Sequence, residues 1–70
     1  MNKPYRIEHY ADLLGLGRET FADTMEEVVL QIFEAVRLNW VIFNIFHEDK
    51  HLYEVNVKPD KTEIIIIKQT

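Results

Sequence analysis

Three residues near the middle of the chain have the side chains and the spacing of a hydrolytic metal site. His47 and His51 are four positions apart, and Glu48 directly follows the first histidine. Two imidazoles at this spacing can bind one zinc ion from one side of a helix, and a nearby carboxylate can take a proton from a metal-bound water. The chemistry requires a helix, because only there do positions i and i+4 point the same way.

The segment HEDKH resembles the zinc-binding motif of the zincin metalloproteases over these five residues. The resemblance implies His47 and His51 as zinc ligands and Glu48 as the general base. The flanking sequences, WVIFNIF and HLYEVNVK, are instead typical of β-strands. A catalytic zinc also needs a third protein ligand, and no histidine follows His51. We therefore predict a solvated hairpin tip with no catalytic residue, metal or cofactor. Loose metal binding by His47 and His51 across the hairpin is the alternative.

The composition removes other kinds of catalytic site. The 70 residues include no cysteine and no serine, so neither disulfides nor thiol and serine nucleophiles are available. Gly15 and Gly17 do not complete a glycine-rich phosphate loop. His9, between Glu8 and Tyr10, is predicted to be a surface residue. We predict that the protein is not an enzyme.

The charge balance bears on the partners. Twelve acidic residues against eight basic ones give a formal net charge of −4, and no basic cluster is present. Binding to a phosphate backbone depends on clustered cations, so a nucleic-acid partner is not expected. The N-terminus lacks the apolar run of a secretory signal, and the longest apolar runs are shorter than the roughly 20 residues that span a bilayer. These features predict a soluble cytoplasmic protein without a membrane partner.

A second motif suggests an alternative function. The segment from Ala11 to Phe21 resembles the first helix, the turn and the start of the recognition helix of bacterial helix-turn-helix regulators. Its matching small and apolar positions are Ala11, Leu14, Gly15, Leu16 and Phe21. The resemblance implies that Arg18 and Thr20 begin the helix that enters the major groove. Thr24 stands where the motif wants an apolar residue, and the following residues are acidic. A small DNA-binding regulator is therefore the alternative function.

Periodicity predicts the elements that position these residues. From Phe21 to Asn39 the apolar residues follow the spacing of one helical stripe, with Thr20 as the N-cap. Three strand-like segments follow, with a turn at Pro59 and Asp60 between the last two. The N-terminal segment YRIEHYADLLGLG reads as a short helix or partly as a strand. We predict a single α+β domain, residues 1–70, with one long amphipathic helix packed on a three-stranded antiparallel β-meander and a short N-terminal helical or extended element.

The strand register decides which residues share a face. Pairing Lys58 with Lys61 places Ile64 and Ile66 on the core side with Tyr53 and Val55. For the first hairpin, a three-residue loop of residues 48–50 would pair His47 with His51. A two-residue loop would turn the amide of Asn44 into the core, so the longer loop is preferred.

This register leaves apolar residues on the outer face of the predicted sheet. They are Ile42, Phe46, Leu52, Ile65 and Ile67. Phe46, Leu52 and Ile67 are predicted to form one row across the three strands. An exposed apolar row needs a cover, either the N-terminal segment or a protein partner. The segment would use Tyr5, Ile7, Tyr10, Leu13, Leu14 and Leu16.

The run Ile64 to Ile67 is predicted to be a strand buried on both faces, since an exposed run at a sheet edge would aggregate. The favoured function is a non-enzymatic intracellular protein–protein interaction module, such as a small adaptor, inhibitor or assembly factor. Its partner is predicted to be another protein or a second copy in a homodimer. The five outer-face residues, or the edge formed by residues 64–67, are predicted to bind that partner.

Overall fold

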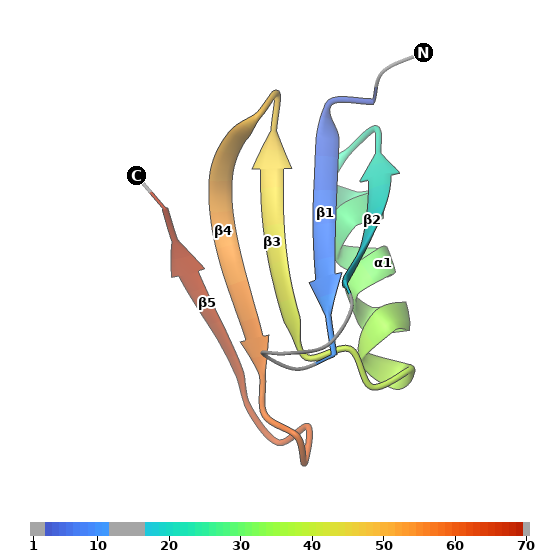
Figure 1. The fold of residues 1–70 in the computed structure, drawn as a ribbon, viewed down its shortest axis with the longest axis vertical. Helices are drawn as coiled ribbons and strands as arrows, with labels where there is room; N and C mark the ends of the chain where they lie inside the picture. The colour runs from blue at the N-terminus through green and yellow to red at the C-terminus, as the bar shows by residue number, and fades with distance from the viewer. Residues whose placement is uncertain (1–2, 12–16, 70) are drawn as a thin grey trace.

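One helix packs on a five-stranded antiparallel sheet in the computed structural model, which describes residues 3–11 and 17–69 (Figure 1). The elements are β1 (Tyr5–Tyr10), β2 (Gly17–Ala22), α1 (Met25–Arg37), β3 (Ile42–His47), β4 (Lys50–Val57) and β5 (Ile64–Lys68). The strand order is β2-β1-β3-β4-β5, so β2 and β5 are the two edges. The predicted α+β class and antiparallel sheet are confirmed. The prediction of a three-stranded meander was wrong, because two N-terminal strands extend the sheet beyond β3.

The N-terminal segment forms part of the sheet itself. Ile7 of β1 opposes Thr20 of β2 on one side and Ile45 of β3 on the other. Tyr5 and Ile7 pack into the core, so this segment does not cover the outer face as one prediction required. Residues 13, 14 and 16, which were assigned to the same cover, lie outside the described residues. Inserting β1 beside β3 satisfies backbone groups that a three-stranded sheet would leave unpaired.

Strand β2 occupies the positions where a recognition helix was predicted to begin. Arg18 opposes His9 and Thr20 opposes Ile7 in an antiparallel ladder. The helix expected to start at Arg18 is therefore absent, and the prediction was wrong. Within residues 17–69 the helix begins only at Met25. That helix is too short and too polar to cross a membrane.

Both ends of α1 are capped by local hydrogen bonds. The hydroxyl of Thr24, and not Thr20, accepts from the Glu27 N–H at 3.2 Å, and the Glu27 carboxylate accepts from the Asp23 N–H at 3.0 Å. At the other end Asn39 has a φ of 72°, and the Trp40 N–H donates to the Ala35 carbonyl. This Schellman-type closure ends the helix at Arg37, two residues before the predicted end.

The first hairpin combines a two-residue turn with a β-bulge. His47 pairs with Lys50, and the turn residues Glu48 and Asp49 both have positive φ, as in a type I′ turn. The register then shifts between Ile45 and Phe46, because Leu52 is an extra residue on β4. The predicted three-residue loop was wrong. The bulge nevertheless restores the predicted register beyond it and keeps the Asn44 amide on the outer face.

The second hairpin has a longer loop than predicted. The Lys58 N–H donates to the Glu63 carbonyl at 3.0 Å, whereas Lys61, at a φ of 61°, donates to Lys58 within the turn. Val55 consequently opposes Ile66, two positions from the predicted register. A shift of two residues preserves the facing of every side chain. Ile64 and Ile66 therefore lie on the helix side of the sheet with Val55, as predicted.

Candidate functional site: an apolar groove beside edge strand β5

The helix covers only one half of the sheet face on which it lies. Figure 1 shows α1 behind β1 and β2, and its contacts with the sheet are mainly to these two strands. The helix side of β4 and β5 is left open. A groove of about 400 Å³ runs between α1 and this uncovered half.

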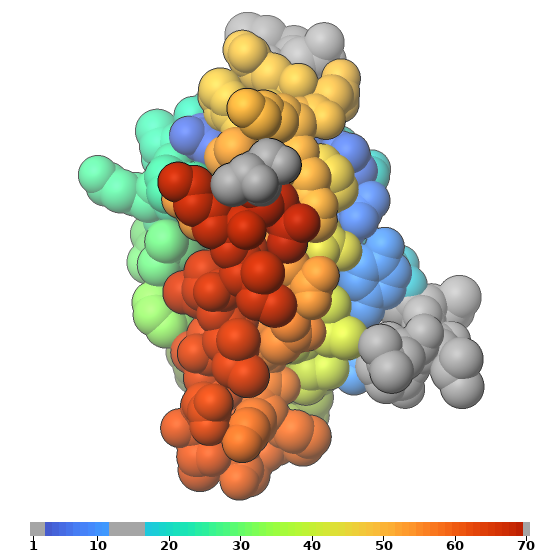
Figure 2. Space-filling view, turned by 90° about the vertical axis from the view of Figure 1, so that its left-hand side faces the viewer, coloured from blue at the N-terminus to red at the C-terminus, as the bar shows by residue number. Residues whose placement is uncertain are grey.

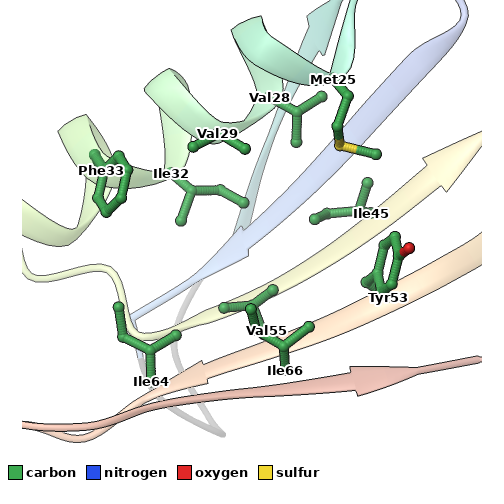
Figure 3. A pocket seen from close by; sticks show the side chains of 10 residues that line it. All are labelled: Met25, Val28, Val29, Ile32, Phe33, Ile45, Tyr53, Val55, Ile64 and Ile66. Atoms are coloured by element: carbon green, nitrogen blue, oxygen red, sulfur yellow. The ribbon is translucent and has the colours of Figure 1, made fainter.

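The groove is lined by apolar side chains from both layers. The helix contributes Met25, Val28, Val29, Ile32 and Phe33, and the sheet contributes Ile45, Tyr53, Val55, Ile64 and Ile66. Figure 3 shows the two sets pointing toward one another across the groove. Phe33 is 57% exposed, and Ile66 is 65% exposed. The groove can therefore bind apolar groups, and its lining offers no acid, base or nucleophile beyond the Tyr53 hydroxyl.

The groove exists because the apolar stripe of α1 is wider than the surface that covers it. Val28 and Ala35 are buried against the sheet. Val29 and Phe33, four residues apart on the neighbouring line of the helix, lie beyond β1 and β2 and stay exposed. A helix stripe of this width normally packs on a full sheet face. The half of the apolar stripe that includes Val29 and Phe33 is therefore not covered by the sheet.

Strand β5 forms the other wall of the groove and is an open edge. All five of its residues are exposed, and Figure 2 shows the strand running along the molecular surface. The prediction that Ile64 to Ile67 are buried on both faces was wrong. Backbone groups on the free side of such an edge have no partner within residues 17–69.

The outer face of the sheet differs from its prediction. Phe46 opposes His51, and Ile67 opposes Glu54, so the predicted row of Phe46, Leu52 and Ile67 does not form. The bulge at Leu52 moves His51 opposite Phe46, and the longer loop of the second hairpin moves Glu54 opposite Ile67. Of the five residues predicted to bind a partner, Ile65 and Ile67 are exposed on β5. Ile42, Phe46 and Leu52 are half-buried.

The chain covers the Phe46 ring with its own side chains. The Arg6 guanidinium lies 4.0 Å from the ring centroid and forms ion pairs with Glu8 at 2.9 Å and Glu19 at 3.1 Å. The His51 ring stacks on the same phenyl group, with centroids 4.8 Å apart. A cation held over an aromatic face by two carboxylates shields that face from water. The centre of the outer face is therefore more polar than the sequence suggested.

The two histidines of the HEDKH motif do not come together. His47 packs against Tyr5, with ring centroids 4.7 Å apart, whereas His51 stacks on Phe46. Consecutive residues of a strand point to opposite faces, so His47 and the Phe46–His51 pair are on different sides of the sheet. Among the described residues no group of three histidine, aspartate or glutamate side chains could hold a metal ion. The motif is a hairpin tip, as predicted.

His9 is fully buried, so its prediction as a surface residue was wrong. Its Nε2 lies 2.7 Å from the Thr20 hydroxyl, which donates to Gln31 Oε1 at 2.6 Å, and Gln31 donates to the Phe21 carbonyl. Because the single hydroxyl proton of Thr20 is donated to Gln31, His9 Nε2 must carry a hydrogen and donate it to the Thr20 oxygen. Burial, followed by the nearby Arg18 charge, lowers the pKa of His9 to about 4. This neutral imidazole joins β1, β2 and α1.

Sequence reasoning missed the groove because it assigned every groove residue to the core. Val29, Phe33, Ile64 and Ile66 have the periodicity of buried positions. Their exposure follows from the position of α1 over β1 and β2, which cannot be read from the pattern of either element alone. The helix has more apolar positions than one half of the sheet can bury. This excess was the feature of the sequence from which the groove could have been predicted.

Comparisons with protein families, with curated proteins and with solved structures found no match to this chain.

Proposed function

We propose that this chain is a non-catalytic protein–protein interaction module that binds its partner through β5 and the adjoining groove. One observation carries the proposal: β5 combines a free backbone edge with four consecutive exposed isoleucines, and it borders an apolar groove. An extended segment that pairs with such an edge gains main-chain hydrogen bonds, and adjacent pockets select its side chains. Roles as an adaptor, an inhibitor or an assembly factor all fit this mode of binding.

The two edges of the sheet differ in a way that favours β5. The edge strand β2 carries Arg18 and Glu19, and charged residues on an edge discourage pairing with another chain. Strand β5 carries no charge between Ile64 and Ile67. Ile65 and Ile67, which were predicted to bind a partner, point to the outer face of this same strand and extend the apolar surface around the edge.

Binding at β5 gains free energy from the apolar side chains that a partner would cover. Full burial of an exposed isoleucine or phenylalanine contributes about 1.5–3 kcal/mol. Covering Phe33, Ile64 and Ile66 therefore offsets part of the entropy lost on association, which is at least about 4 kcal/mol. Main-chain hydrogen bonds along β5 make a further favourable contribution to the free energy of binding. Binding in the micromolar range is the expected result.

A displayed peptide library tests the proposal. The chain is immobilised at low density, so that copies do not meet, and peptides that bind are recovered and titrated into labelled protein for NMR. We expect apolar extended peptides whose binding shifts the signals of Ile64, Ile66 and Phe33. The Ile66→Lys variant should lose these peptides.

The matched control is Phe21→Lys, which places the same charge at an exposed apolar position on the opposite edge strand. That variant should retain the peptides. Recovery of no peptide by a chain that stays monomeric, or signal changes confined to the outer face or to β2, would contradict a binding site at β5.

A further inference from the structure

We infer that the partner of β5 is a second copy of this chain, paired antiparallel through β5 about a twofold axis that passes beside Ile66. The inference rests on the proposed function and identifies its partner. The backbone geometry of β5, the facing of its side chains and the charges that flank the isoleucines all support this pairing.

The hydrogen bonds of β5 to β4 fix which backbone groups remain free. The Lys58 N–H donates to the Glu63 carbonyl, and the Gln69 N–H donates to the Leu52 carbonyl. In an antiparallel ladder the hydrogen-bonded residues alternate, so residues 63, 65, 67 and 69 bond toward β4. The N–H and carbonyl groups of Ile64, Ile66 and Lys68 therefore point away from the sheet.

Twofold symmetry then restricts the register. Antiparallel pairing of two identical edges requires an axis perpendicular to the sheet, which keeps both helix sides on the same face. Ile64, Ile66 and Lys68 all face the helix side, so they can oppose one another. With the axis beside Ile66, Ile66 opposes the partner's Ile66, and Ile64 opposes the partner's Lys68. An axis beside Ile65 or Ile67 would leave one of the three residues without a partner.

The side chains fit this register. Ile65 opposes the partner's Ile67 on the outer face, and Glu63 opposes the partner's Gln69. No two like charges are directly opposed along the strand, a condition that a stable cross-strand pair requires. The Ile66 pair on the helix side and the Ile65–Ile67 pairs on the outer side lie in contact in the joined sheet and shield part of each other's surface from water.

A second copy suits β5 better than a foreign strand for two reasons. Each copy brings the same three free residues in the same spacing, so all outward backbone groups of β5 are satisfied at once. A chain of 70 residues also has a small core, and association with another subunit is a common source of stability at this size. The product is a ten-stranded sheet with both helices on one face.

Sedimentation velocity up to about 500 μM chain, a range that includes weak association, tests the pairing. We expect a species of twice the chain mass, and a single-chain mass throughout would overturn the inference. Ile66→Lys should abolish the dimer, because two ammonium groups would face each other across the axis. An equimolar mixture of the Ile66→Lys and Ile66→Glu variants should restore it, whereas Phe21→Lys should leave it unchanged.

Single cysteines test the register, since the natural chain has none. Directly opposed residues have Cα atoms about 5.5 Å apart, within the range of a disulfide. Mild oxidation should therefore cross-link Ile66→Cys and leave Ile65→Cys largely uncross-linked. Efficient cross-linking of Ile65→Cys alone would overturn the register. Circular dichroism of each variant confirms that it is folded.

The two proposals can fail separately. A monomer that still selects peptides at β5 removes the second copy and keeps the interaction module. A monomer that selects none removes both. A dimer that survives Ile66→Lys is formed elsewhere and overturns the pairing of β5.

Discussion

His47 and His51 lie on opposite faces of the sheet, although they are only four residues apart. The turn at Glu48 and Asp49 pairs His47 with Lys50 and Phe46 with His51, so the two histidines fall on positions of opposite facing. The zinc chemistry suggested by their spacing requires both rings on one side.

Zinc titration should therefore reveal no site that these two histidines share. We expect calorimetry to show binding no tighter than about millimolar, with no change in His47→Ala or in His51→Ala. Micromolar binding that is lost on either substitution would show that the two rings meet after all.

The same turn offers a way to stabilise the protein. Asp49 has a φ of 69°, a conformation that disfavours residues with a Cβ, and glycine is preferred at the second position of a type I′ turn. Asp49→Gly should raise the free energy of unfolding by about 0.5–1 kcal/mol, measured by urea denaturation. Asp49→Ala keeps the strain and serves as the control, and equal effects of the two substitutions would argue against the turn type.

Stability should fall in acid because of His9. The pKa of His9 is about 4 in the folded chain, whereas an unperturbed histidine, as in the unfolded chain, has a pKa of 6.5. As the pH falls, the unfolded chain therefore binds this proton before the folded chain does. The contribution of His9 to the free energy of unfolding begins to fall near pH 6.5 and is lost near pH 4. Each pKa unit corresponds to about 1.4 kcal/mol, which gives a total of about 3 kcal/mol.

Urea denaturation of the wild type and of His9→Phe, between about pH 7 and about pH 4.5, measures this contribution. Phenylalanine preserves the aromatic contact with Phe43, whose ring centroid lies 5.3 Å from that of His9, and cannot be protonated. The wild type should lose more stability than the variant over this range. Parallel curves would mean that His9 is protonated as easily in the folded chain as in the unfolded one.

The hydroxyl of Thr20 is expected to matter more than its methyl group. Thr20→Val would leave the buried His9 N–H and the half-buried side-chain oxygen of Gln31 without partners, at a cost of about 1–3 kcal/mol. Thr20→Ser keeps the hydroxyl and should cost less. If thermal melts show the two variants to be equally stable, the hydrogen-bonded chain from His9 to Gln31 does not hold β2 to α1.

The success of sequence reasoning varied with how each element is buried. Helix α1 and strand β4 have one apolar and one polar face, so their periodicities of 3.6 and 2 were clear. Strand β2 was missed because its inward-facing positions include Arg18 and Thr20, and only Ala22 is buried. Thr20, which hydrogen-bonds to His9 and Gln31, stands at an inward-facing position where an apolar residue is usual. The apolar residues of β2 therefore do not alternate.

The candidate site was predicted on the right strand but mainly on the wrong face. Ile65 and Ile67 were expected to bind a partner, and both are exposed on β5. Ile64 and Ile66 were assigned to the core, because the sequence does not show that α1 lies over β1 and β2. Which half of a sheet a helix covers depends on the strands that are present. The sequence did not predict β1 and β2, and α1 packs on these two strands, so β4 and β5 stay uncovered.

The interior position of β1, between β2 and β3, affects how the chain folds as it is synthesised. Strands β1 and β2 and helix α1 leave the ribosome before β3, yet the second side of β1 can pair only when β3 follows. Until then Ile7 and its neighbours form an open strand edge that other nascent chains can reach, a state that favours misassembly. Removal of the first ten residues would expose β3 in the same way, so an N-terminal truncation should be poorly tolerated even though it spares the helix, the groove and β5.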